Sequence, residues 1–209
     1  MRVKLLVVEL GALIKGGTSM ESFRKIIPAA CMQSGAVFQQ GQWVCWNAPH
    51  SKLKLNVEDS CMDDVMRGGG LIRDNRGSVL LAFSSFYGDD TSIGAEARAM
   101  DTGLSICKSF NIQISEVELD STVLVGLLQK EGNVPWELIY IIGKCRALLS
   151  QGPSILHTRR EGNGATDALA KKGMSEERLI LYTSSGSIPN DCKLTIKGDA
   201  LGHHHFLPP

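Results

Sequence analysis

The chain has 209 residues, 43% of them hydrophobic, which gives room for one domain of ordinary size with a substantial core, plus extensions. Lys and Arg (22) balance Asp and Glu (22), so the net charge excludes a strong overall attraction for a polyanion, and a nucleic acid has to be bound by a local basic face. The six cysteines contain no Cys-x-x-Cys pair, and no apolar run approaches the roughly 20 residues of a membrane span. A zinc site and a membrane protein are therefore not expected, whereas reduced thiols in an intracellular protein are.

The two ends of the chain lack the patterns of a folded core. Residues 1–43 begin with a short apolar run that Glu9 interrupts, without a small-residue cleavage site, and continue in a stretch rich in Gly, Ser and Gln. Residues 175–209 lose periodicity and gain Ser, Gly and Pro. We predict an N-terminal extension and linker over 1–43, one domain over 44–174 and a C-terminal tail over 175–209, in a protein of the nucleus or cytoplasm that is not secreted.

Three strands open the predicted domain. Apolar and polar residues alternate over residues 53–58, so that the acidic Glu58 arrives where the first strand should end. Two further runs, 67–74 and 78–84, flank a turn at Gly77, and glycine accepts the positive φ that a tight turn needs. We expect these strands to form an antiparallel meander.

The period changes to that of a helix between Ser92 and Phe110. Glu96 falls in the first turns, on the stripe that faces the sheet, where the small residues Ala99 and Gly103 permit close approach. Two interpretations stay open: Glu96 is a functional carboxylate, or it is a first-turn Glu that the helix dipole favours or that swings out to solvent.

A second alternating run ends at Asp120, directly before a helix over 123–129. Asp120 is therefore either a functional carboxylate at a strand end or a cap of that helix. The remaining chain predicts a helix over 135–150, a strand over 154–159 and a short helix over 163–172 with Asp167 in its early turns. The element order β-β-β-α-β-α-α-β-α predicts an α/β fold. We expect a five-stranded mixed sheet, three antiparallel strands followed by parallel strands, flanked by helices.

Five motifs in this order carry a family resemblance. The motifs are Trp46…Pro49…Lys54-Leu-Asn-Val-Glu-Asp-Ser60, Gly69-Gly-Leu-Ile-Arg-Asp74…Gly77, Ala95-Glu-Ala97, Val117-Glu-Leu-Asp-Ser121 and Arg160-Glu-Gly-Asn-Gly-Ala-Thr-Asp-Ala-Leu-Ala-Lys171. Through these motifs, over about residues 44–174, the chain resembles the plant ribonuclease H-like domains of the reverse-transcriptase-like group, which are type 1 ribonuclease H relatives derived from retroelements.

The resemblance implies a ribonuclease H-like fold and a nuclease site. In the family, four acids hold two Mg²⁺ ions, for which Mn²⁺ is a substitute, and cut the RNA strand of an RNA–DNA hybrid. Only oxygen ligands that converge from several elements hold two such hard cations side by side. By position, the catalytic and metal-binding residues are Glu58, Glu96, Asp120 and Asp167.

The first of these acids departs from the family pattern, which is Leu-Asn-Val-Asp-Gly-Ser. Glu58 stands at the place of the Asp, and Asp59 at the place of the Gly. Glu keeps the charge but adds roughly 1.3–1.5 Å of reach, in a kind of site where a misplacement of about 1 Å can cost roughly a hundredfold in rate. Asp59 points to the opposite face of a regular strand, so it replaces Glu58 only if the strand ends or bulges there.

The residues around the last predicted helix favour a nucleic-acid partner. By position, Asn163, Arg159, Arg160 and Lys171 are candidates to contact an RNA–DNA hybrid without sequence preference, chiefly through phosphates. The alternative is that these charges form an ordinary solvated helix face. His157 is interpreted as a strand residue, because the segment lacks the loop that carries a catalytic His in some ribonucleases H. We expect a monomer, and the alternative to a nuclease is a catalytically silent interaction module or a retroelement remnant.

Overall fold

A computed structural model of the chain describes residues 42–50, 52–129, 133–150, 152–173, 179–201 and 205–207. Most of the predicted extension over 1–43 lies outside these residues. Trp43–Phe206 form one compact unit, and the description below concerns this unit. No helix among the described residues has the length and apolar character needed to cross a membrane.

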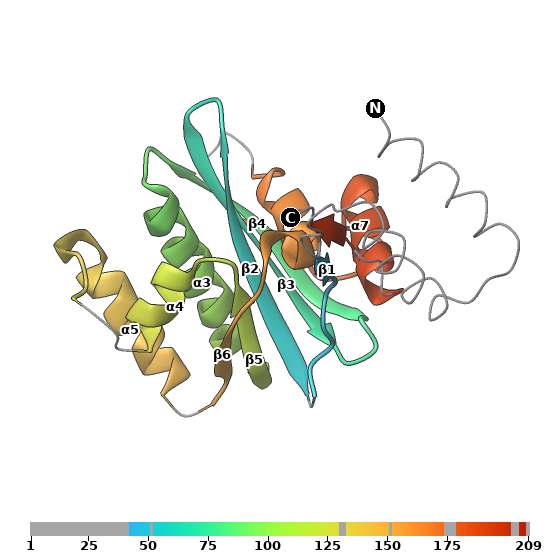
Figure 1. Cartoon of the computed structure of the whole chain (residues 1–209), viewed down its shortest axis with the longest axis horizontal. Coiled ribbons are helices and arrows are strands. Elements are labelled where there is room, and N and C mark those ends of the chain that lie inside the picture. Colours follow the sequence, from blue (N-terminus) through green and yellow to red (C-terminus); the bar gives the residue numbers. More distant parts are fainter. Residues whose placement is uncertain are drawn as a thin grey trace, which may run out of the picture. The chain divides into compact units, whose positions relative to one another are not determined.

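A six-stranded mixed sheet forms the centre of the unit, in the order β6-β5-β2-β3-β4-β7 (Figure 1). Strands β2, β3 and β4 form the predicted antiparallel meander, and β5 and β6 continue the sheet in parallel to β2. The strand bounds are Leu53–Met62 (β2), Val65–Asp74 (β3), Val79–Gly88 (β4), Ile114–Leu119 (β5), Ser154–His157 (β6) and Ile180–Tyr182 (β7). Two further strands, β1 (Gln42–Val44) and β8 (His205–Leu207), pair as a separate two-stranded sheet.

The prediction of five strands is therefore one strand too low. Strand β7 pairs antiparallel with β4 and comes from the region predicted as a tail. A strand of only three residues is too short for an alternating pattern to identify it.

The β3–β4 turn has the predicted chemistry. Gly77 has φ +78°, and the Asp74 carboxylate accepts backbone hydrogen bonds from Arg76 (2.9 Å) and Ser78 (2.8 Å). The turn thus combines a glycine in the left-handed region with an Asp that satisfies the exposed amides.

Helices cover both faces of the sheet (Figure 1). On one face lie α3 (Ser92–Ser109), α4 (Thr122–Leu128), the 3₁₀ turn η1 (Trp136–Leu138) and α5 (Ile139–Leu149). On the other lie the 3₁₀ turn η2 (Arg160–Asn163), α6 (Gly164–Ala170) and α7 (Asn190–Ala200). The predicted helix over 135–150 is divided into η1 and α5, and the one over 163–172 is preceded by η2.

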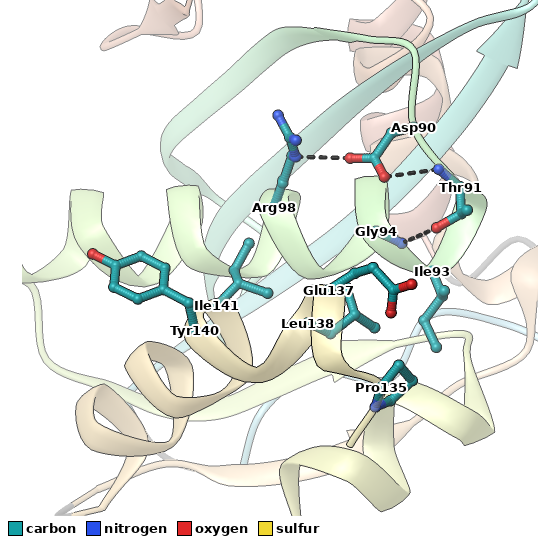
Figure 2. Close-up of a pocket in the computed structure, with 10 residues that line it drawn as sticks. All are labelled: Asp90, Thr91, Ile93, Gly94, Arg98, Pro135, Glu137, Leu138, Tyr140 and Ile141. Atoms are coloured by element: carbon teal, nitrogen blue, oxygen red, sulfur yellow. Dashed lines mark hydrogen bonds and ion pairs between the residues drawn. The ribbon is translucent and has the colours of Figure 1, made fainter. Parts of the chain in front are cut away.

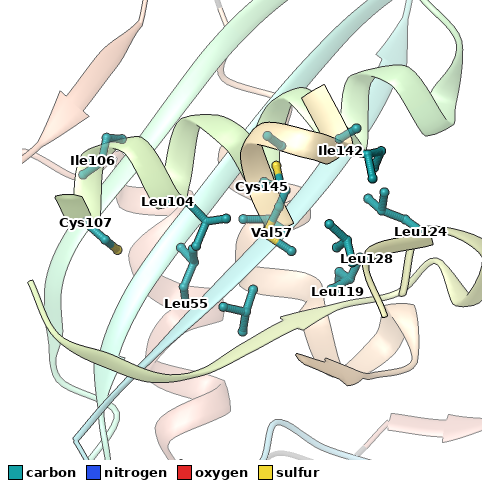
Figure 3. Close-up of a cluster of buried hydrophobic side chains, with 14 of the residues drawn as sticks. Leu55, Val57, Leu104, Ile106, Cys107, Leu119, Leu124, Leu128, Ile142 and Cys145 are labelled. Carbon is teal, nitrogen blue, oxygen red and sulfur yellow. The ribbon is translucent and has the colours of Figure 1, made fainter. Parts of the chain in front are cut away.

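The core on the α3 face is built from residues that alternate along β2 and repeat along the helices. Figure 3 shows its centre, which includes Leu55, Val57, Leu104, Ile106, Leu119, Ile142 and Cys145. The described cysteines, Cys45, Cys61, Cys107, Cys145 and Cys192, are free thiols, as predicted.

Strand β3 contains three consecutive glycines, Gly68–Gly70, which let the Phe83 ring and helix α6 approach its backbone closely. A Cβ on Gly70 would lie 2.1 Å from the Phe83 ring, whereas a Cβ on Gly69 would lie 2.4 Å from the backbone nitrogen of Ala170 in α6. Helix α6 therefore lies directly on the backbone of β3. The Ser84 hydroxyl fixes it further by donating to the Leu169 carbonyl at 2.6 Å.

Helix α7 is an element that the sequence analysis did not predict. Ile188, Cys192 and Ile196 are buried in a second core cluster with Leu71 of β3 and Leu169 of α6. Part of the predicted tail thus packs on the sheet.

Candidate active site

Three of the four predicted acids lie close together at one end of the sheet. Glu58 lies in the second half of β2, Glu96 in the first turns of α3, and Asp120 directly after β5, which runs parallel to β2. Glu58 and Glu96 are each only 2% exposed. Glu96 Oε1 accepts a hydrogen bond from the Ser121 backbone at 3.2 Å, which connects α3 to the end of β5.

The acids are close enough to influence one another's ionisation. Burial, followed by the charge of Asp120, raises the pKa of Glu58 to about 9 and that of Glu96 to about 8. Burial also raises the pKa of Asp59 to about 6, although a hydrogen bond donated by the Ser92 hydroxyl acts to lower it. Buried carboxylates that repel one another are costly to ionise unless a cation compensates them.

Asp167, the fourth predicted acid, has cations beside it. Lys171 pairs with its Oδ2 one helical turn along α6, and Arg160 Nη2 lies 3.5 Å from its Oδ1. Asp167 Oδ1 is buried and accepts no hydrogen bond. Much of the charge of Asp167 is thus already compensated, and Asp167 is not among the main groups that shift the pKa of Glu58 or Glu96.

The Arg160 guanidinium interacts electrostatically with Asp167 and with two of the other acids, Glu58 and Asp120. Burial opposes its charge, but the neighbouring carboxylates of Glu58, Asp167 and Asp120 outweigh that effect and raise the pKa of Arg160. Its side chain is 64% exposed. Arg160 therefore stands at the solvent edge of the acidic cluster, within the field of three of its members.

The donor set suits a hard divalent cation. Carboxylate oxygens are the ligands that Mg²⁺ prefers, and Asp167 Oδ1 is a buried oxygen that accepts no hydrogen bond, although Arg160 Nη2 lies 3.5 Å away. Among the residues that the structure describes, however, no group of three His, Cys, Asp or Glu side chains is arranged to hold a metal ion. The chemistry of the site therefore fits such an ion, while its present arrangement is not a formed metal centre.

The predicted nucleic-acid contacts divide into exposed and buried residues. Arg159 is exposed, and the side chains of Arg160 and Lys171 are 64% and 49% exposed. Asn163 is fully buried, and its amide Nδ2 donates to Glu58 Oε2 at 2.8 Å and to the Val57 carbonyl at 2.7 Å.

His157 lies in strand β6, as predicted, but it is the last residue of a strand that was expected to run to residue 159. Its Nε2 lies 2.9 Å from the backbone carbonyl of Asp120. Because a carbonyl only accepts, Nε2 has to carry the proton in this contact. His157 thus holds the chain where Asp120 leaves β5.

Sequence reasoning missed a buried charge network on the same strands. Lys54 Nζ pairs with Glu116 at 3.2 Å and Glu118 at 3.3 Å. Arg73 pairs with Asp199 of α7 at 2.9 Å. The signal for the first group was present in the opposed charges of two alternating runs, Lys54 in the first and Glu116 and Glu118 in the run that ends at Asp120, whereas no local pattern relates Arg73 to a residue 126 positions away.

A separate pocket of about 640 Å³ lies between the start of α3 and the η1–α5 segment (Figure 2). Ile93, Leu138 and Ile141 supply apolar walls, and Arg98 Nε pairs with Asp90 at 2.7 Å on its rim. None of the four predicted acids lines this pocket.

Comparison with known proteins places the chain among ribonuclease H relatives. It matches the family described as reverse transcriptase-like over residues 57–173. It is 27% identical over 154 residues to an Arabidopsis thaliana protein named as a candidate ribonuclease H, a match that covers 72% of this chain and 24% of that protein. The chain thus spans about a quarter of that relative.

Three solved structures share the fold. Ribonuclease H1 of Halobacterium salinarum superposes with a TM-score of 0.54 at 20% identity, covering 58% of this chain and 96% of that one. The LC11 ribonuclease H1 from compost, solved with an RNA/DNA hybrid, superposes with a TM-score of 0.54 at 21% identity, covering 60% of this chain and 98% of that one. The ribonuclease H domain of a Mycobacterium tuberculosis protein gives 0.55 at 21% identity, with 60% and 100% covered. The fold is therefore that of ribonuclease H, and because the family match spans more than half of its residues, the chain belongs to the reverse transcriptase-like family, as its motifs implied.

Proposed function

We propose that the domain binds RNA–DNA hybrids and hydrolyses their RNA strand with two Mg²⁺ ions, for which Mn²⁺ is a substitute. Glu58, Glu96, Asp120 and Asp167 are the proposed ligands. The observation that carries this proposal is the cluster of Glu58, Glu96 and Asp120, in which burial and mutual repulsion raise the pKa of both glutamates. The name of the Arabidopsis relative supports the same activity.

A cation is what this cluster lacks. Two carboxyls that resist ionisation in the free protein become favourable ligands once a divalent cation supplies the compensating charge. When bound, the two ions would activate the attacking water and stabilise the leaving oxygen. The buried Oδ1 of Asp167 supplies a further oxygen at the edge of the cluster.

The exposed cations beside the cluster suit a phosphate backbone. Arg159, Arg160 and Lys171 present charge without any groove-reading element between them, so we propose that they contact phosphates. Binding should then weaken with salt and show little sequence preference.

A specific observation favours a second candidate, a catalytically silent interaction module. Asp167 is already paired with Lys171 and Arg160, which compensate much of its charge in the absence of a metal ion. If these contacts persist in solution with Mg²⁺ present, the domain binds hybrids without turnover.

Cleavage of a labelled RNA–DNA hybrid in Mg²⁺ and in Mn²⁺ separates the two candidates. The native chain is compared with Asp120→Asn and with Asp101→Asn, a matched control on α3 whose carboxylate pairs with Lys144. Cleavage that Asp120→Asn abolishes and Asp101→Asn retains would establish the nuclease. Hybrid binding without cleavage, together with activity gained in Glu58→Asp, would establish the silent module, and cleavage retained in Asp120→Asn would remove the site assignment.

A further inference from the structure

Asn163 occupies an unusual position for a residue beside a nucleic-acid surface. It ends η2 and is fully buried against β2. Its Nδ2 group donates both to the Val57 carbonyl (2.7 Å) and to Glu58 Oε2 (2.8 Å). One amide group thus holds both the backbone and the carboxylate at the end of β2.

Thr166 fixes the orientation of that amide. Its hydroxyl lies 2.7 Å from the Asn163 backbone carbonyl and also within hydrogen-bond reach of Asn163 Oδ1. A hydroxyl has one proton to donate, so it serves one of these acceptors at a time. Either way, Oδ1 faces Thr166, and the two protons of Nδ2 face β2.

The position of Asn163 relative to Glu58 is set by the docking of α6. Gly69 pairs with Glu58 in the β2–β3 ladder, and the α6 backbone rests on it. On the next strand, Ser84 pairs with Gly69 and holds the Leu169 carbonyl at 2.6 Å. Helix α6 therefore has little freedom to move away from the carboxylate.

We propose that Asn163 is a positioning residue for Glu58 in the metal site. The tether occupies Oε2 and holds the longer Glu side chain in one orientation, which leaves Oε1 for a cation. An Asp at position 58 would end roughly 1.3–1.5 Å short of the amide, beyond hydrogen-bond reach of a contact that is now 2.8 Å. Asn163 thereby compensates for the additional methylene of Glu58. This inference rests on the proposed function.

Mn²⁺ binding, measured by calorimetry on the full chain, tests the positioning role. Asn163→Ala should weaken Mn²⁺ affinity by about 10- to 100-fold, the usual effect of removing a hydrogen-bond partner of a metal ligand. Thr166→Val keeps the side-chain volume, is less disruptive to folding and should weaken affinity to a smaller extent.

The matched control is Asn56→Ala. Asn56 is an equally buried amide on β2, and it donates to Glu118 at 2.7 Å rather than to a proposed ligand. The Asn56→Ala variant should be less stable than the native chain but should keep the native Mn²⁺ affinity. Unchanged affinity in Asn163→Ala, or an equal loss in Asn56→Ala, would overturn the positioning role.

A measurement without metal distinguishes the failure of this inference from the failure of the proposed function. A double-mutant cycle of Glu58→Ala and Asn163→Ala, read from urea midpoints in metal-free buffer, should be non-additive because the two side chains are in contact and each variant removes the hydrogen bond between them. Additive shifts would refute the tether itself. No Mn²⁺ binding by the native chain, together with a non-additive cycle, would refute the proposed metal site and with it the positioning role, while leaving the tether as a structural contact.

Discussion

Removal of the Asp199 carboxylate should destabilise the domain more than any surface substitution. Asp199 lies in α7 and pairs with Arg73 of β3 at 2.9 Å, with the two side chains 4% and 0% exposed. Burial lowers the pKa of Arg73, and Asp199 is the first of the groups that oppose this effect. In Asp199→Ala the guanidinium would stay buried without its main counter-charge.

The size of the loss follows from the partners that remain. Breaking a buried ion pair by removing one partner costs about 3–5 kcal/mol. Arg73 would keep the Asn56 oxygen at 3.2 Å and the Trp46 ring, whose centroid is 4.0 Å away. We therefore expect the lower end, about 3 kcal/mol, which at a urea dependence of roughly 2 kcal/mol per molar lowers the unfolding midpoint by about 1.5 M.

Urea unfolding followed by circular dichroism measures this shift, and α7 itself supplies the control. Asp191 lies on the same helix and pairs with Lys172, but its side chain is 62% exposed, so Asp191→Ala should leave the midpoint unchanged. Asp199→Ala combined with Arg73→Met removes the uncompensated charge and should recover part of the loss. Equal midpoints for Asp199→Ala and Asp191→Ala would refute the reasoning and show that α7 contributes little to the fold.

Two further predictions concern the docking of α6 and the acidic cluster. Gly69→Ala should destabilise the chain, because its Cβ would lie 2.4 Å from the backbone of α6, whereas Gly143→Ala, whose Cβ meets nothing within 4 Å, should stabilise α5 by about 0.5–1 kcal/mol; thermal unfolding of both variants checks the contrast. For the cluster, the folded pKa values of Glu58 (about 9) and Glu96 (about 8) lie above the ordinary 4.5. The folded chain therefore binds more protons than the unfolded chain, so the free energy of unfolding without metal should fall as the pH rises from about 4.5 to 9. Urea midpoints at pH 5, 7 and 9 measure this fall, and Glu58→Gln should flatten it; a rise with pH would contradict the assignment of these pKa shifts.

The parts of the fold that the sequence predicted are those with a local period. Alternation over residues 53–58 and the helical stripe from Ser92 identified β2 and α3, because apolar side chains on one face of β2 alternate with polar ones on the other and the buried residues of α3 repeat with the helical period. Helix α7 escaped prediction because its burial depends on a few apolar residues and on the ion pair between Arg73 and Asp199, which lie 126 positions apart. A long-range contact of this kind leaves no trace in a local window.

At the candidate site, the sequence predicted the positions of residues better than the contacts of their side chains. The family resemblance implied one site for Glu58, Glu96, Asp120 and Asp167, and in the structure Glu58 and Glu96 are both close enough to Asp120 for its charge to raise their pKa. The same patterns assigned Asn163 to a nucleic-acid surface, whereas the structure commits its amide to Glu58. Sequence position gives the element on which a side chain lies, but it does not give the groups that the docking of α6 brings against it.

Two groups of buried carboxyls lie along β2 and β5, and they differ in how their charge is compensated. At one end, the buried carboxylates of Glu116 and Glu118 both pair with Lys54, which is itself only 1% exposed, so an internal cation compensates part of their charge. At the other end, Glu58 lies four residues after Lys54 in β2 and has no lysine among its described hydrogen-bond or ion-pair partners. Arg160, whose charge interacts with Glu58, is largely exposed to solvent. Both ends of the sheet use polar residues on alternating positions, so the alternation cannot distinguish them. Buried carboxyls whose ionisation is disfavoured, with no buried cation paired to them, are therefore what distinguishes the proposed cation site from the Lys54 end.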